Sequence, residues 1–205
     1  MYRLYDFLPS GNGYKVRLLL RQLAIPFEHI EKNIIAGETR TPDFLAINAN
    51  GRIPVLEVSP GQYLAESNAI LFYLSQNTAF FPDNPWDQAQ VMRWLFFEQY
   101  SHEPHIATSR YWLHSLNQGE KFREQLDQKR PLGYAALQVM EDHLKTRAFF
   151  VNESYSIADI ALYAYTHVAD EGGFDLSPFT AIQQWFARVK AQPHHCLITD
   201  SMGRF

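Results

Sequence analysis

Two stretches of the sequence decide the fold: residues 50–57, NGRIPVLE, and, after a turn, residues 64–70, LAESNAI. A proline between a turn and an apolar strand removes one N–H from the strand ladder and restricts the residue before it. This leaves the backbone of Ile53 able to pair with something other than protein. Glu66 and Ser67 open a helix, where the first backbone N–H groups attract anions. Together the two stretches predict a site for a short peptide-like ligand that carries a free carboxylate and a free amine.

The composition is that of an ordinary globular protein. With 205 residues, of which 46% are hydrophobic and 20% charged, the chain is expected to form one or two domains with a sizeable core. A formal net charge of -4 argues against nucleic acid as a partner, and no run approaches the ~18 apolar residues of a membrane span. The single cysteine, Cys196, excludes an internal disulfide. Because the first residues also lack a signal-peptide pattern, we expect a cytoplasmic protein.

The first 78 residues alternate between strand and helix patterns. Apolar residues at i, i+3, i+4 and i+7 predict the first helix, and Thr41 followed by Pro42 predicts the start of the second. The segment 59–61, SPG, reads as a hairpin turn. The predicted order is β-α-β-α-β-β-α, a small mixed sheet with helices on its faces.

Residues 79–86 form a proline-bearing linker, and residues 87–205 follow a helical pattern throughout. A long aromatic helix is predicted over residues 88–116. A capping box is predicted at Ser156 and Asp159, ahead of an apolar helix. Between these two segments a further helix is predicted. Its residues at helical spacing are Leu132, Ala136, Val139, Met140, His143 and Leu144.

Four signals in the same order resemble the cytosolic glutathione transferase family: Ser10 ahead of the first helix, Ile53-Pro54, the run 66–70, and residues 156–159. The resemblance covers essentially the whole chain. It implies an α/β thioredoxin-like N-terminal domain plus an all-α C-terminal helical domain. It also implies a cis bond before Pro54, a homodimer, and glutathione as co-substrate.

Two side chains compete for the role of catalytic donor. The resemblance implies that the Ser10 hydroxyl donates to the glutathione sulfur, although a serine here is also an ordinary turn or N-cap residue. The run 12–15, NGYK, is similar to the bacterial nu-type branch, which uses glutathione to reduce disulfides. That branch has Thr and Pro where this chain has Ser10 and Gly11. Asn12 is therefore a second candidate, and its alternative interpretation is a turn residue in a left-handed conformation.

The resemblance also implies the residues that would hold glutathione. Ile53, next to Pro54, would pair through its backbone with the cysteinyl part. Glu66 would bind the ammonium of the γ-glutamyl end, and Ser67 its carboxylate. Acids and serines also favour helix starts for structural reasons alone.

The glycyl carboxylate would be bound by Arg40 or Arg52, since arginine forks onto carboxylates. Many relatives have His where this chain has Thr39, so this end of the site departs from the family pattern. The alternative for either arginine is a solvated surface charge.

The second-substrate pocket is expected to draw on the loop before the first helix and on the long helix of the second half. Aromatic residues at helical spacing more often belong to the core than to a pocket. His102, Glu103 and His105 could be taken for metal ligands, but Pro104 interrupts their spacing, and we expect no metal. The expected lining residues are Leu8, His105, Arg110 and Tyr111.

The sequence therefore predicts an enzyme that conjugates the glutathione thiolate to a hydrophobic electrophile. One alternative is a glutathione-dependent disulfide or peroxide reductase, in which the sulfur of glutathione does the redox chemistry because no Cys-x-x-Cys motif is present. Another is a non-catalytic binding or regulatory protein of the same fold.

Overall fold

The computed structural model describes residues 1–200, which divide into two compact units. The first comprises residues 1–76 together with residues 193–200, and the second comprises residues 77–192. The predicted division gave all residues after 86 to the helical domain. In the structure the segment after Pro193 packs with the first unit, because Tyr14 and Arg17 bond its backbone.

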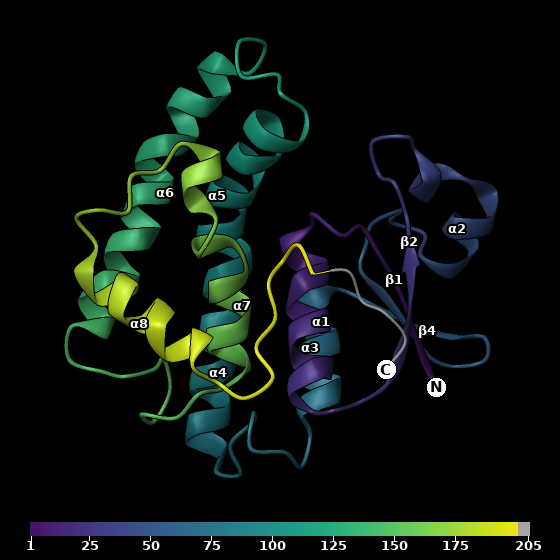
Figure 1. The fold of residues 1–205 in the computed structure, drawn as a ribbon, viewed down its shortest axis with the longest axis horizontal. Helices are drawn as coiled ribbons and strands as arrows, with labels where there is room; N and C mark the ends of the chain where they lie inside the picture. Colours follow the sequence, from purple (N-terminus) through teal and green to yellow (C-terminus); the bar gives the residue numbers. More distant parts are fainter. Residues whose placement is uncertain (201–205) are drawn as a thin grey trace. The chain divides into compact units, whose positions relative to one another are not determined.

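The first unit has the predicted order of strands and helices (Figure 1). Its described part contains one four-stranded sheet in the order β2-β1-β3-β4, with β1 parallel to β2 and antiparallel to β3. This confirms the predicted thioredoxin-like arrangement. The elements are β1 Tyr2–Asp6, α1 Gly11–Gln22, β2 Phe27–Glu31, α2 Pro42–Ile47, β3 Val55–Ser59, β4 Gln62–Ala65 and α3 Ser67–Ser75.

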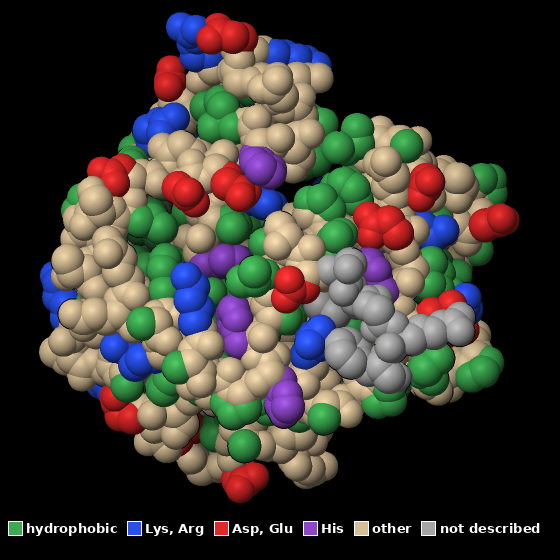
Figure 2. Space-filling view, in the orientation of Figure 1, with side chains coloured by type: hydrophobic (Ala, Val, Ile, Leu, Met, Phe, Trp, Pro, Cys, Tyr) green, Lys and Arg blue, Asp and Glu red, His purple; other side chains and the backbone are tan. Residues whose placement is uncertain are grey.

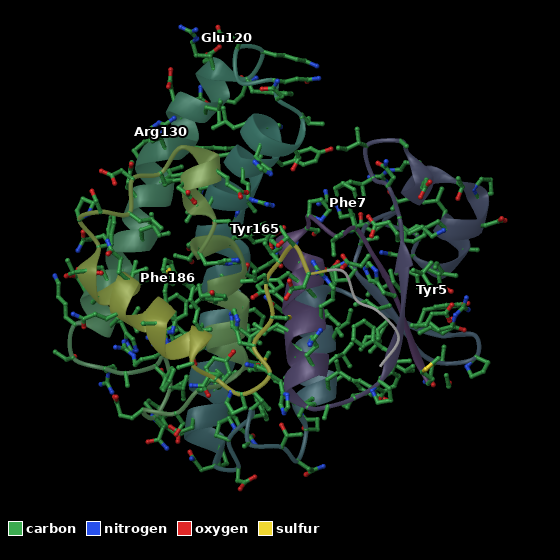
Figure 3. The ribbon with its side chains drawn as sticks, in the orientation of Figure 1. Tyr5, Phe7, Glu120, Arg130, Tyr165 and Phe186 are labelled. Atoms are coloured by element: carbon green, nitrogen blue, oxygen red, sulfur yellow. The ribbon has the colours of Figure 1, made fainter. Side chains whose placement is uncertain are left out.

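The strand register brings three chain segments to one edge of this sheet. Tyr5 of β1 lies opposite Val55 of β3, and Val55 lies opposite Ala65 of β4. The end of β1, the start of β3 and the end of β4 are therefore neighbours. The loop that leads into α1 and the residues that open α3 leave the sheet at this edge, and Figure 3 labels Phe7 in that loop.

Local capping fixes where the helices of this unit begin. The Ser10 side chain caps α1, and Thr41 accepts the Phe44 N–H at 3.3 Å to cap α2, as predicted. Helix α1 packs against α3 and is buried from Tyr14 to Leu20. The start of α1 is thus held firmly at the edge of the sheet.

The second unit is helical. Its helices are α4 Pro85–Phe97, α5 Glu103–Arg110, α6 Arg123–Leu144, α7 Ile157–Thr166 and α8 Thr180–Lys190. The single helix predicted over residues 88–116 is instead interrupted by π-helical turns at Glu98–His102 and Tyr111–Ser115. Pro104 lacks the N–H that would bond to the Tyr100 carbonyl, so a regular α-helix cannot continue through this point.

Helix α7 forms the centre of the second unit, since all its residues are buried. The predicted capping box is confirmed: Ser156 and Asp159 bond each other's backbone groups, and Trp185 of α8 donates to Asp159 Oδ1 at 2.9 Å. The predicted face of α6 was partly wrong, because Leu132 and Val139 are 52% and 48% exposed. None of the helices described is long and apolar enough to span a membrane.

Candidate functional site

Four of the predicted site residues, Ser10, Asn12, Glu66 and Ser67, lie where α1 and α3 begin. The Ser67 hydroxyl donates to Asn12 Oδ1 at 3.1 Å, which joins the two helix starts directly. The ammonium of Lys15 lies 3.4 Å from the same hydroxyl, and the Lys15 side chain is fully buried. A buried cation and two helix N-termini together form an environment that favours a bound carboxylate.

Ser10 caps α1, as one of its two interpretations predicted. Its Oγ accepts the Gly13 N–H at 3.4 Å and so caps α1. This bond uses an oxygen lone pair and leaves the hydroxyl hydrogen able to donate elsewhere. The capping interpretation and the catalytic interpretation are therefore compatible.

Asn12 does not lie in a left-handed loop turn. It lies in the first turn of α1 with ordinary helical backbone, so the left-handed alternative was wrong. Its Oδ1 accepts the Ser67 hydroxyl, and Nδ2 is the donor group of this side chain.

The Ile53–Pro54 bond is cis, which confirms the prediction. Pro54 is buried ahead of β3, and Ile53 is half-buried. Among the described residues, none forms a hydrogen bond with the backbone N–H or C=O of Ile53. This is the backbone that the sequence marked as available to a ligand.

Glu66 has an unusual backbone conformation, with φ 69° and ψ 112° just before α3. A positive φ is uncommon for a residue other than glycine and persists only where its surroundings impose it. The Glu66 side chain is exposed and makes no capping bond, whereas Ser67 beside it is buried. The carboxylate of Glu66 is thus presented at the same helix start as Ser67.

The two candidate arginines differ. Arg40 Nη1 donates to the Asn50 carbonyl at 3.0 Å, so its guanidinium already holds the turn before Ile53. The side chain of Arg52 is exposed, and in the described part of the chain no partner of its guanidinium is found. Of the two, Arg52 is the one whose whole guanidinium fork remains for a ligand.

Several residues close to the start of α1 were not predicted to take part in the site. Asp6 and Arg17 form a fully buried ion pair, with Arg17 Nε 2.9 Å from Asp6 Oδ2. A Cβ on Gly13 would lie only 1.5 Å from Asp6 Oδ1, so glycine is required there. A cation near a helix N-terminus is disfavoured by the helix dipole, so the position of Lys15 could have indicated a specific role.

The expected second-substrate residues of the long helix lie at α5. The Arg110 side chain is buried and its Nε lies 2.6 Å from Glu171 Oε2, so it takes part in an ion pair. His105 Nδ1 is buried without a hydrogen-bond partner among the described residues, and burial, followed by the charge of Lys129, lowers the pKa of this imidazole. Tyr111 follows in the π-helical turn, and Leu8 lies in the first unit, in the loop before α1.

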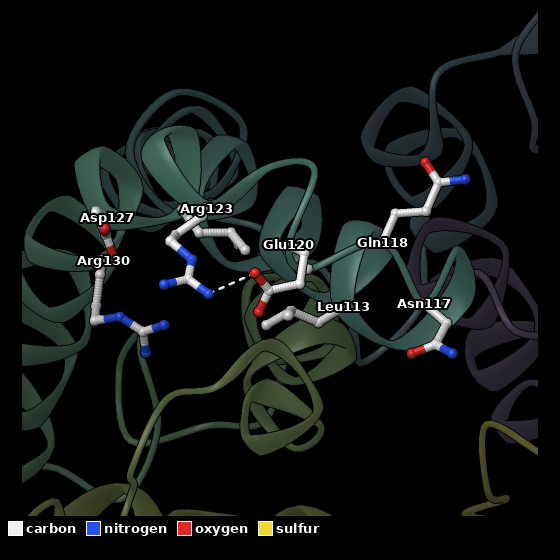
Figure 4. Close-up of a pocket in the computed structure, with 9 residues that line it drawn as sticks. Leu113, Asn117, Gln118, Glu120, Arg123, Asp127 and Arg130 are labelled. Atoms are coloured by element: carbon white, nitrogen blue, oxygen red, sulfur yellow. Dashed lines mark hydrogen bonds and ion pairs between the residues drawn. The ribbon is translucent and has the colours of Figure 1, made fainter.

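A cavity of about 490 Å³ lies within the second unit, near the start of α6 (Figure 4). Two of its lining residues, Arg123 and Glu120, form an ion pair (Figure 4). Charged side chains gather at this end of the unit in the space-filling view (Figure 2). The cavity contains none of the predicted site residues; it is lined by Leu113, Asn117, Gln118, Gly119, Glu120, Arg123, Leu126, Asp127 and Arg130.

Two domain models of one family match this chain. Residues 1–76 match the model of the glutathione S-transferase N-terminal domain, and residues 92–193 match that of the C-terminal domain. The chain belongs to the glutathione S-transferase family. The fold described above is therefore the glutathione transferase fold.

Individual relatives agree on the fold and differ in what they are said to do. The structure of a glutathione S-transferase from Pseudomonas fluorescens Pf-5 is 49% identical, with a TM-score of 0.95 over 97% of this chain and 99% of that one. The disulfide-bond oxidoreductase YfcG of Escherichia coli is 28% identical over 94% of this chain and 92% of its own. Ure2p in complex with glutathione is 25% identical, with a TM-score of 0.83 over 94% of this chain and 95% of that one.

In the described part of the chain, no group of three or more His, Cys, Asp or Glu side chains is placed to hold a metal ion. His102, which the sequence brought near two other possible ligands, bonds Thr166 Oγ1 at 2.8 Å inside the second unit. The arrangement at α1 and α3 is suited to binding an anionic peptide-like molecule and to stabilising a thiolate.

Proposed function

We propose that this protein is a glutathione transferase that binds glutathione at the start of α1 and α3 and conjugates it to hydrophobic electrophiles. The observation that carries the proposal is the hydrogen bond of 3.1 Å between Asn12 and Ser67, with Lys15 beside it. It joins the donor turn of α1 to the helix start that would receive the γ-glutamyl carboxylate. The proposed setting is the cytoplasm.

Each part of glutathione has a counterpart among these residues. The first N–H groups of α3 take the γ-glutamyl carboxylate, the Ser67 hydroxyl turns from Asn12 Oδ1 to join them, and Glu66 takes the ammonium. The backbone of Ile53 pairs with the cysteinyl part in the manner of an added strand. Arg52 receives the glycyl carboxylate, since Arg40 is already bonded to Asn50.

The chemical task is to hold the sulfur as a thiolate near neutral pH. A free thiol has a pKa of about 8.5, so only a few per cent is ionised at pH 7. The Ser10 hydroxyl and the positive end of α1 both favour the thiolate. The thiolate then forms a bond to the electrophilic carbon, and the leaving group departs with the electron pair of the broken bond.

A second candidate function is glutathione-dependent disulfide reduction. It is favoured by the 28% identity to the disulfide-bond oxidoreductase YfcG and by the run Asn12-Gly13-Tyr14-Lys15. The protein's own Cys196 is unsuited to this chemistry, because it is buried and burial raises the pKa of its thiol to about 11. Two glutathione molecules would supply both electrons and end as glutathione disulfide.

We propose small hydrophobic molecules as the second substrates. We also propose that the protein is a homodimer. Trp86, Phe96 and Tyr100, on α4 and the π-helical turn after it, are 72%, 65% and 85% exposed. Their spacings of ten and four residues return to one side of a helix. Large exposed apolar side chains that share one face are typical of a surface that another protein covers.

Two assays with glutathione test the function. With 1-chloro-2,4-dinitrobenzene, a transferase forms the thioether and releases chloride, whereas a reductase reduces 2-hydroxyethyl disulfide faster. We expect conjugation to dominate. Dominant reduction would support the second candidate, and glutathione binding by calorimetry without either activity would support a non-catalytic protein.

A further inference from the structure

Charged side chains hold the loop that carries Ser10, and they do so through its backbone. The Leu8 N–H donates to both carboxylate oxygens of Glu31, at 3.1 and 3.2 Å. The Leu8 carbonyl accepts a hydrogen bond of 2.6 Å from Arg17 Nη2. Both polar backbone groups of Leu8, two residues before Ser10, are therefore bonded to ionised side chains.

Arg17 is an unusual residue for this task because it is fully buried. Its Nε lies 2.9 Å from Asp6 Oδ2, and its Nη1 donates to the Ile198 carbonyl at 3.1 Å. Burying a charge is costly unless its partners are well placed. Arg17 Nη1 and Nη2 donate to two separate carbonyls, whereas Nε lies beside the Asp6 carboxylate and has no hydrogen-bond partner among the described residues. The compact ammonium of a lysine cannot span these separate positions.

The loop is fixed at its other points as well. The Phe7 N–H donates to Asp6 Oδ1 at 2.6 Å, and the Ser10 N–H donates to the Phe7 carbonyl at 2.7 Å. Asp6 therefore connects Arg17 to the first residue of the loop, and Phe7 connects Asp6 to Ser10. A series of contacts thus runs from Arg17 through Asp6 and Phe7 to Ser10.

We propose that Arg17 and Glu31 are positioning residues, which hold the backbone of Leu8 at its carbonyl and at its N–H and thereby set the position of the Ser10 hydroxyl. This inference rests on the proposed function. A hydrogen bond to a developing thiolate stabilises it only at the correct distance and angle. A small displacement of a group that acts on the reacting atom is enough to lower a rate by an order of magnitude or more.

Helix α1 also offers a matched control. Tyr14 donates its hydroxyl to the Cys196 carbonyl at 2.7 Å, in the same C-terminal segment that Arg17 reaches at Ile198. Tyr14→Phe therefore removes a buried hydrogen bond from the same helix to the same segment, and leaves the Leu8 bonds in place. It separates a loss of stability from a displacement of the loop.

The test measures the pKa of bound glutathione from thiolate absorbance near 240 nm, at saturating glutathione, in the full chain. Arg17→Lys should raise this pKa by about one unit, which means about tenfold less thiolate at pH 6.5. The kcat for chlorodinitrobenzene should fall to the same extent at pH 6.5 and much less at pH 9, with little change in the KM for glutathione. Tyr14→Phe should leave the pKa at the wild-type value.

Glu31→Gln is the second variant, and its side chain is 48% exposed, so the fold should tolerate the change. It should shift the thiolate pKa in the same direction even if Arg17→Lys does not fold. If a folded Arg17→Lys or Glu31→Gln protein kept the wild-type pKa of bound glutathione and the wild-type pH profile, the positioning role would be wrong. The proposed function would not be affected. A wild-type protein that does not lower the pKa of glutathione would overturn the proposed function and the inference with it.

Discussion

The side chains of Ser10 and Asn12 differ in their hydrogen bonds. Ser10 keeps its hydroxyl hydrogen for donation, whereas Asn12 is tied through its amide oxygen to Ser67, at the helix start proposed for the γ-glutamyl end. We therefore expect Ser10→Ala to raise the pKa of bound glutathione by about one unit, the effect of losing one hydrogen bond to a charged group. Turnover should fall more at pH 6.5 than at pH 9, because high pH supplies the thiolate without help.

Asn12→Ala should instead weaken glutathione binding through Ser67 and move the thiol pKa little. Absorbance titration and calorimetry of both variants separate the two roles. Ser59→Ala, at the end of β3, is the control for loss of a serine hydroxyl. A shift in pKa caused by Asn12→Ala and not by Ser10→Ala would exchange the assignments.

Glu66 offers an equally direct test at the scale of one residue. Its carboxylate is exposed beside Ser67, on backbone whose φ of 69° fixes its direction. We expect Glu66→Ala to weaken glutathione binding roughly 10- to 150-fold, the range for a lost hydrogen bond to a charged group. Calorimetry measures this, with Glu124→Ala, an exposed acid in the first turn of α6, as control. Equal affinity in a folded Glu66→Ala protein would remove Glu66 from the site.

At the scale of elements, the sequence predicted best what local chemistry decides. Thr41 with Pro42 marks the start of α2, and Ser156 with Asp159 marks the start of α7, because capping involves residues only a few positions apart. The site residues at helix starts were readable for the same reason. The interruption of the long helix was not predicted, because the aromatic periodicity continues past Pro104 and does not reflect the N–H that this proline lacks.

The burial of Lys15 and Arg17 could not be predicted from the apolar periodicity of α1. Lys15 and Arg17 flank Val16 and look like solvent-facing residues, yet both are fully buried. Their partners, Ser67 and Asp6, come from a different helix and from a strand. Only the tertiary structure brings these groups together, so periodicity within α1 gives no sign of them.

The start of α7 carries a prediction about pH. Burial raises the pKa of Asp159 to about 7, although hydrogen bonds from Trp185 and Ser156 oppose the rise. The folded state therefore retains a proton that the unfolded chain releases above about pH 4. Since the folded state binds more protons in this interval, the contribution of Asp159 to stability is present below about pH 4 and is lost as the pH rises towards 7.

Urea unfolding between pH 4.5 and 7.5 measures this contribution. Asp159→Asn should lower stability at all pH values, because an amide cannot replace every acceptor bond of the carboxylate. It should also remove the part of the pH dependence that the wild type shows between 4.5 and 7. If the difference between wild type and variant stayed constant with pH, Asp159 would have an unshifted pKa.

At the scale of the whole molecule, some contacts join parts of the chain that no sequence pattern connects. The Tyr14 hydroxyl and the Cys196 carbonyl are 182 positions apart, and their bond assigns the segment after Pro193 to the first unit. The sequence placed this segment with the helices because it follows the last of them. Order along the chain was a poor guide here, since hydrogen bonds to α1 determine where the segment packs.

The exposed aromatic face of α4 leads to the last prediction, which concerns assembly. If Trp86, Phe96 and Tyr100 lie in the interface of a symmetric dimer, each substitution acts twice, because an isologous interface contains every residue in two copies. Light scattering of the wild type should give twice the chain mass of 23.8 kDa at micromolar concentration. Phe96→Asp places a charge on this face and should shift the mass towards that of one chain. Leu132→Asp, on α6 and 52% exposed, adds the same charge elsewhere and should leave the mass unchanged. A wild type that scatters as a single chain would refute the dimer, and a Phe96→Asp protein that stays dimeric would move the interface away from α4.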